Sequence, residues 1–212
     1  MLLFNRKKTL KIKAVVGPEY CYVDAYAPIT LGADLKGNGE LSKEGIVIPM
    51  WSDLAIKWDD EKIKWQFSDR NSKLSLHGED QSPGFLSDYI HLKMHCPWML
   101  ETSVPMLAIH ASSYLNTPAP YIVPYGIIPP IDNKISTNIF LFLKKNGKEN
   151  KLMIKHGTPM LQLIPLYDGP FKLTKAVISG EEYQLFAGNV GALTAFNKRG
   201  LQLLHKEKIN KK

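Results

Sequence analysis

The stretch that decides the fold runs from Pro105 to Pro165 and closes with His156-Gly157-Thr158-Pro159-Met160-Leu161-Gln162-Leu163-Ile164-Pro165. A Ser-Ser pair and a Gly-Ile-Ile triplet precede a first apolar run, and the quoted turn leads into a second one. Short apolar runs that lie between Gly, Pro, Ser and Asn are typical of β-strands. The stretch therefore predicts a β scaffold.

The same punctuation continues outward along the chain, which has 15 glycines and 14 prolines in 212 residues. Windows rich in β-branched and aromatic residues lie between these breakers, and each window predicts a strand. We expect strands at residues 10–16, 45–50, 54–58, 62–67, 73–77, 90–95, 106–110, 137–143, 151–155 and 160–166. Alternation in the window 62–67 predicts that Ile63, Trp65 and Phe67 face the core while the polar residues between them face water.

The windows 137–143 and 151–155 are separated by a polar segment that contains Asn146-Gly147. This dipeptide supplies the positive φ angles of a tight turn, so we expect the two strands to pair as a hairpin. Apolar residues recur at helical spacing near the C-terminus and predict a helical segment at 189–208. The fold prediction is a single all-β domain over 1–212, a distorted barrel or sandwich of β-clip or jelly-roll type with a short C-terminal helix.

Composition restricts the classes of function. No apolar run is long enough to cross a bilayer, so no association with a membrane is expected. The two cysteines, Cys21 and Cys96, lie far apart and predict reduced thiols rather than a disulfide framework or a zinc site. The net charge is +7, but much of the excess sits at the two ends of the chain. Basic ends are usually solvated tails, so nucleic acid is not an expected partner.

Residues 104–166 resemble the trimeric dUTPase and dCTP deaminase superfamily. The features that carry the resemblance are Ser112-Ser113, the turn 126–128 and Gln162 in the quoted turn. In that family a serine-containing turn holds phosphate and a glutamine turn shapes the nucleotide site. The resemblance therefore implies Ser112, Ser113 and Gln162 as the residues that would bind a nucleotide.

Two departures from the family bear on catalysis. Ala111 stands where the family has an arginine, and Pro129 stands where it has the aspartate that activates water. Proline has no group that accepts a proton, so general-base catalysis at this turn is excluded. We therefore expect no catalytic residue. The resemblance leaves one alternative to a non-catalytic function, which is a dUTPase-like or dCTP deaminase-like nucleotide enzyme or an inactive nucleotide-binding relative.

Residues 20–168 are similar to an uncharacterised family of tailed-phage proteins. The similarity lies in ordered landmarks: Trp51-Ser52-Asp53, Trp65, Pro97-Trp98 and Gly157-Thr158-Pro159. It implies a viral origin and a location in the host cytoplasm or the virion. The functional prediction is a non-catalytic phage or viral binding or assembly protein, a virion component or an accessory protein of infection. We expect protein partners, a homo-oligomer and no cofactor.

Histidines give a possible metal site. His91 and His95 share one face of a predicted strand with Lys93, and His77 or His110 could add a ligand. Paired histidines on a half-exposed strand are more often ordinary surface residues, so no metal site is predicted.

Aromatic residues offer a contact surface. Tyr114, Tyr121 and Tyr125 lie in or beside the proline-rich segment Pro118–Pro130. They either pack in the core, as most large aromatic side chains do, or form an exposed recognition or assembly surface.

Overall fold

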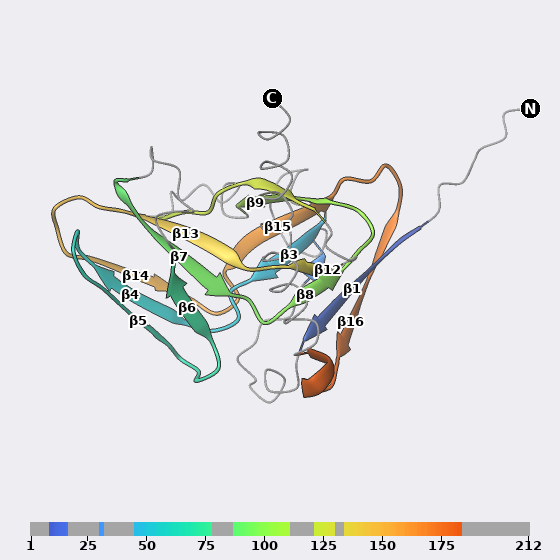
Figure 1. The fold of residues 1–212 in the computed structure, drawn as a ribbon, viewed down its shortest axis with the longest axis horizontal. Helices are drawn as coiled ribbons and strands as arrows, with labels where there is room; N and C mark the ends of the chain where they lie inside the picture. The colour runs from blue at the N-terminus through green and yellow to red at the C-terminus, as the bar shows by residue number, and fades with distance from the viewer. Residues whose placement is uncertain are drawn as a thin grey trace, which may run out of the picture.

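The structure, a computed structural model, describes residues 9–16, 30–31, 45–77, 87–110, 121–129 and 134–183. These residues form sixteen strands and one helical turn at 180–183, which confirms the all-β prediction (Figure 1). The strands make four open sheets, so the arrangement is sandwich-like rather than a closed barrel. The helical segment predicted at 189–208 lies outside the described residues.

Each sheet joins strands from distant parts of the chain. Sheet A has the order β12 (Lys134–Ser136), β8 (Met99–Glu101), β1 (Leu10–Val16) and β16 (Phe171–Val177). Sheet B has the order β11 (Gly126–Ile128), β9 (Met106–His110), β15 (Pro159–Pro165), β3 (Ile46–Pro49) and β2 (Thr30–Leu31). Sheet C has the order β14 (Asn150–Ile154), β4 (Leu54–Trp58) and β5 (Ile63–Phe67). Sheet D has the order β10 (Tyr121–Ile122), β13 (Ile139–Lys144), β7 (Tyr89–His95) and β6 (Lys73–Leu76).

One hydrophobic core joins the four sheets. Its buried side chains include Ile12 of sheet A, Ile48 of sheet B, Ile56 of sheet C and Leu92 and Leu141 of sheet D. These residues alternate with more exposed ones along most strands, as expected when one face of a sheet is packed. In Figure 1, β4 and β14 of sheet C and β7 and β13 of sheet D lie towards the left of the view, and β1 and β16 of sheet A lie towards the right.

The ten predicted strands are all present, with ends that differ by at most two residues from the prediction. The longest strand missed is β16, whose residues 171–177 are mostly exposed or half-buried. It pairs in parallel with β1 from the other end of the chain, with Leu10 opposite Phe171. A partner so distant in sequence leaves no local turn signal.

The predicted hairpin is wrong, because β13 lies in sheet D and β14 pairs with β4 in sheet C. The indole nitrogen of Trp58 on β4 donates to the carbonyl of Lys144 at 3.0 Å. The carboxylate of Asp60 accepts hydrogen bonds of 3.0 Å from the backbone nitrogens of Asn146 and Gly147. These contacts direct the turn at 145–149 towards sheet C, so Asn-Gly joins two sheets instead of two paired strands.

Trp65 also departs from expectation. Ile63 and Phe67 are half-buried against the core as predicted, but Trp65 between them is 37% exposed. The strand β5 is the edge of sheet C, and in Figure 1 it is the outermost strand on that side. Alternation identifies the inward face, but it does not show how far the opposing layer extends.

Two glycines with positive φ provide a matched test of the fold. A Cβ added to Gly45 (φ 79°) would lie 2.3 Å from the carbonyl oxygen of Leu163, whereas one added to Gly147 (φ 71°) meets nothing within 4 Å. Gly147→Ala should cost about 1 kcal/mol through backbone strain alone, and Gly45→Ala should cost at least about twice that. Urea unfolding measures both, and equal losses would contradict the close packing of Gly45 on β15.

Candidate binding face

A corner joins sheet B to sheet C. The strands β3 and β15 of sheet B continue through residues 50–53 and 155–158 into β4 and β14 of sheet C. These two connecting segments, which we call the crossings, are hydrogen-bonded to each other. Met50 N donates to Thr158 O at 2.7 Å, and Gly157 N donates to Met50 O at 2.8 Å. A positive φ of 82° at Gly157 and a register shift between Pro159 and Leu161 accompany the bend.

The carboxylate of Asp53 holds this corner. It accepts hydrogen bonds from the backbone nitrogen of His156 at 2.7 Å and from Lys155 Nζ at 3.1 Å. These two bonds, the backbone one first, lower the pKa of Asp53 from its ordinary value. The Ser68 hydroxyl accepts a bond from Asp53 N at 3.1 Å and lies 2.9 Å from the buried Ser52 hydroxyl. The ends of all three strands of sheet C are thus tied together.

A second set of bonds supports the corner from within. The buried Trp51 indole donates to the Ser72 hydroxyl at 2.9 Å, and that hydroxyl donates to Asp69 at 2.6 Å. Partial burial raises the pKa of Asp69, but hydrogen bonds from Ser52, Ser72 and the backbone outweigh it, so the net pKa is lowered. The landmarks Trp51-Ser52-Asp53 and Gly157-Thr158-Pro159 therefore meet at this corner.

Beyond this corner, sheet C carries a row of lysines on the face that points away from the core, which we call its outer face. Lys151 on β14 lies opposite Lys57 on β4, which lies opposite Lys64 on β5. Directly paired residues share a face, so the three ammonium groups stand on one side of the sheet. We call Lys57, Lys64 and Lys151 the lysine row.

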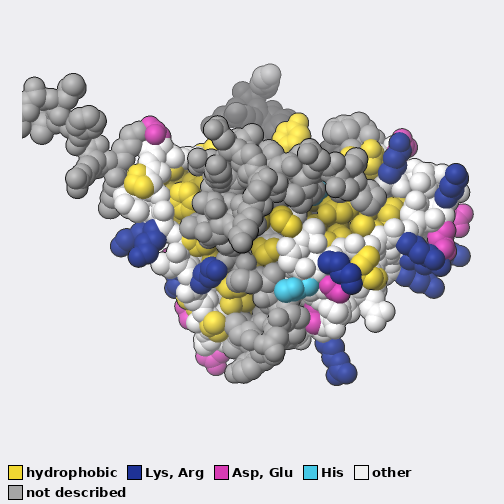
Figure 2. All heavy atoms as spheres, turned by 180° about the vertical axis from the view of Figure 1, so that it is seen from behind, with side chains coloured by type: hydrophobic (Ala, Val, Ile, Leu, Met, Phe, Trp, Pro, Cys, Tyr) yellow, Lys and Arg dark blue, Asp and Glu magenta, His cyan; other side chains and the backbone are white. Residues whose placement is uncertain are grey.

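A shallow hollow of about 630 Å³ lies over the same face and is lined by residues 55–57, 64–66 and 151–153, one stretch from each strand. Beside the lysine row, its second line consists of Met153, Ala55 and Gln66 in register. Met153 is 54% exposed. Figure 2 views the molecule from behind and shows Lys and Arg side chains gathered towards its right margin, with acidic side chains among them. The face therefore combines positive charge with apolar surface.

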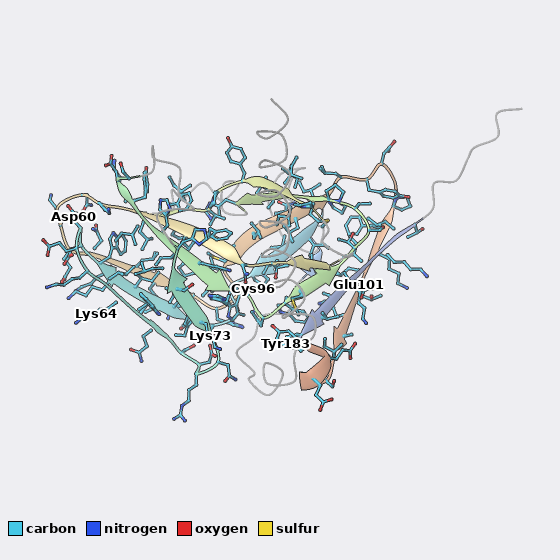
Figure 3. The ribbon with its side chains drawn as sticks, in the orientation of Figure 1. Asp60, Lys64, Lys73, Cys96, Glu101 and Tyr183 are labelled. Carbon is cyan, nitrogen blue, oxygen red and sulfur yellow. The ribbon has the colours of Figure 1, made fainter. Side chains whose placement is uncertain are left out.

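One acidic side chain partly neutralises the row. Glu149 lies 2.6 Å from Lys57 Nζ and 3.9 Å from Lys151 Nζ. No described acidic group forms an ion pair with Lys64, which Figure 3 shows on the outermost strand of the sheet. Two unit charges about 5 Å apart in water repel by only about 0.8 kcal/mol, so a hydrated row is tolerated. An acidic ligand would relieve that repulsion and add attraction.

The residues implied by the nucleotide-enzyme resemblance are placed only in part. Gln162 lies on β15 in the middle of sheet B, between Ile109 of β9 and Val47 of β3, and is 1% exposed. A side chain this buried offers no surface to a ligand from solvent in this arrangement. Ser112 and Ser113 lie outside the described residues. Pro129 is exposed and directly follows β11.

The described histidines come together only in part, since His77 N donates to the carbonyl of His91 on the neighbouring strand at 2.9 Å. His91 and His95 lie four residues apart on one face of β7, where His91 stacks on Phe142 with ring centroids 4.4 Å apart and His95 bonds to Ser75 at 3.0 Å. His77 packs against Phe140 of the same sheet, and His110 belongs to sheet B. Among the residues that the structure describes, no three His, Cys, Asp or Glu side chains form a group that could hold a metal ion.

The tyrosines and cysteines take different positions. Tyr121 is buried, whereas Tyr125 is 85% exposed, so only the second is available for contact in this part of the chain. Tyr114 and Cys21 lie outside the described residues. Cys96 is a buried free thiol, and burial raises its pKa to about 12.

Sequence reasoning identified Lys64 as facing water but missed the lysine row. The sequence shows only lysines on the polar faces of three separate strands. That these lysines form a row depends on the register that places residues 57, 64 and 151 side by side. That register includes the pairing of β14 with β4, which the expected hairpin did not reveal.

No family model matches this chain, and no curated protein or solved structure matches it at the significance required. In the described part of the chain, no helix is both long and apolar enough to cross a membrane.

The corner predicts a dependence of stability on pH. The ionised form of Asp53 stabilises the fold above its ordinary pKa of 3.8, and this contribution is lost as the pH falls through the lowered pKa of the folded state. Asp53→Asn should therefore be less stable than wild type at neutral pH, with a gap that shrinks as the pH falls below the ordinary pKa. Urea unfolding along a pH series measures this, and a constant gap down to the most acidic point would contradict the role of Asp53.

Proposed function

We propose that this chain is a non-catalytic binding or assembly protein of a phage or other virus, and that the outer face of sheet C binds an acidic protein partner. The observation that carries the proposal is the lysine row beside an apolar hollow. Interfaces combine apolar contact with complementary charge, and charge complementarity favours the correct partner over others. The viral part of the proposal is supported by the ordered landmarks of the sequence.

The lysine row is not explained by protection of an exposed strand edge. Lysines on edge strands discourage indiscriminate pairing, which accounts for Lys64 on β5. Lys57 lies on the central strand β4, with a lysine opposite it on each side. Like charges placed opposite each other destabilise a sheet, so the arrangement favours a role in binding.

A protein partner fits the face better than a nucleic acid does. Glu149 lies within the row, and Asp59, Asp60 and Glu61 follow β4 at one end of the sheet. These carboxylates would repel a continuous phosphate backbone. A protein segment can place single carboxylates at the lysines and apolar side chains over Met153.

Replacement of the lysine row tests the proposal. The triple variant Lys57→Gln, Lys64→Gln and Lys151→Gln should bind fluorescein-labelled polyglutamate about tenfold more weakly than wild type, measured by fluorescence anisotropy at low salt. A loss of this size is expected because each of the three exposed ion pairs contributes about 0.5 kcal/mol to the binding free energy. Glu149→Gln should have the opposite effect and strengthen binding, because it releases Lys57 and Lys151.

The matched control replaces Lys11, Lys13 and Lys172 by Gln on sheet A, where Lys11 lies opposite Lys172. This control makes the same change in net charge, so an equal loss of affinity would show that only total charge matters. Tighter, row-dependent binding of single-stranded DNA would overturn the choice of an acidic protein. Hydrolysis of dUTP or deamination of dCTP by the wild-type protein would overturn the non-catalytic proposal and favour the nucleotide enzyme.

A further inference from the structure

One side of the edge strand β5 presents backbone groups that pair with no other strand in the described part of the chain. Asp59 N donates to Lys62 O and Ser68 N donates to Asp53 O, which fixes these pairs as the hydrogen-bonded positions of the β4–β5 ladder. Such positions alternate along an antiparallel pair, so Lys64 and Gln66 also bond towards β4. The N–H and C=O groups of residues 63, 65 and 67 therefore point away from β4. No described strand pairs with that side of β5.

The side chains of β5 offer a ligand polar contacts on one face of the strand and apolar contacts on the other. Lys64 and Gln66 stand on the outer face and continue the lines of Lys57 and Ala55. Ile63, Trp65 and Phe67 stand on the inner face, where Trp65 keeps 37% of its surface exposed. A strand added beside β5 would place alternate residues next to Lys64 and next to Trp65.

We propose that the acidic partner binds as a β-strand added to the free edge of β5, with acidic residues that extend the lysine row and apolar residues that cover Trp65. This inference rests on the proposed function and specifies the form of the ligand. Main-chain hydrogen bonds to residues 63, 65 and 67 supply affinity, and alternation of acidic and apolar side chains supplies specificity.

A second copy of the same edge fits this position poorly. Pairing two β5 strands would place Lys62 and Lys64 of each copy on the same outer face of the joined sheet. Exposed lysines on an edge strand oppose such self-pairing. An acidic strand meets the same lysines with the opposite charge, so charge complementarity selects a partner of different sequence.

Amide hydrogen exchange measured by NMR tests the edge directly. In the free protein the amides of Ile63, Trp65 and Phe67 should exchange faster than those of Lys64 and Gln66. The probe is a capped six-residue peptide that alternates Val and Glu. At about ten times its Kd the peptide should slow exchange of the three edge amides roughly tenfold and leave Lys64 and Gln66 unchanged.

Two N-methylated forms of the probe provide the matched control. Methylation of all Val amides and methylation of all Glu amides remove donors from opposite sides of the peptide strand. Main-chain pairing predicts that one form loses binding and the other retains it, whereas equal effects would overturn the inference.

The outcomes separate this inference from the proposed function. Lysine-dependent binding of the peptide without protection of the edge amides would overturn strand addition and leave the proposed function standing. Failure of polyglutamate to bind would overturn the proposed function itself. Protection of the three amides by raised protein concentration alone, with a dimer in sedimentation, would assign the edge to a second copy and overturn the inference.

Discussion

The corner at residues 50–53 and 155–158 is the constraint on which the rest of sheet C depends. Here two paired strands leave sheet B together and enter sheet C together. Backbone bonds between Met50, Gly157 and Thr158 keep the crossings in register, and Asp53 ties the second crossing to the first. A bend of this kind needs a residue that tolerates positive φ and an acceptor for the freed backbone donors, which Gly157 and Asp53 provide.

The same corner explains how the candidate face is assembled. Because β4 and β14 enter sheet C already paired, Lys57 is fixed opposite Lys151, and the short turn into β5 brings Lys64 alongside. The opposite turn at 145–149 is held by Trp58 and Asp60, which fixes the other end of β14. The lysine row is thus a product of register rather than of any local sequence motif.

Local patterns predicted the strands well and their partners poorly. The windows around β1, β4 and β9 match in full because alternation and breakers act within a few residues. Asn146-Gly147 forms a turn with positive φ at Gly147, but hydrogen bonds that join this turn to Trp58 and Asp60 direct the following strand into sheet C. The exposed Trp65 shows the same limit, because an inward-facing pattern does not reveal where the opposing layer ends.

The sequence by itself determined an all-β chain, most strand positions and the water-facing position of Lys64, because these follow from period-two alternation and from Gly and Pro. Only the tertiary structure decided that β16 joins β1, that β13 and β14 lie in different sheets and that three lysines form one row. Pairing between distant strands depends on burial of their apolar faces and on hydrogen bonds between distant turns. Alternation shows which face of a strand is buried, but it does not show which distant strand is the partner.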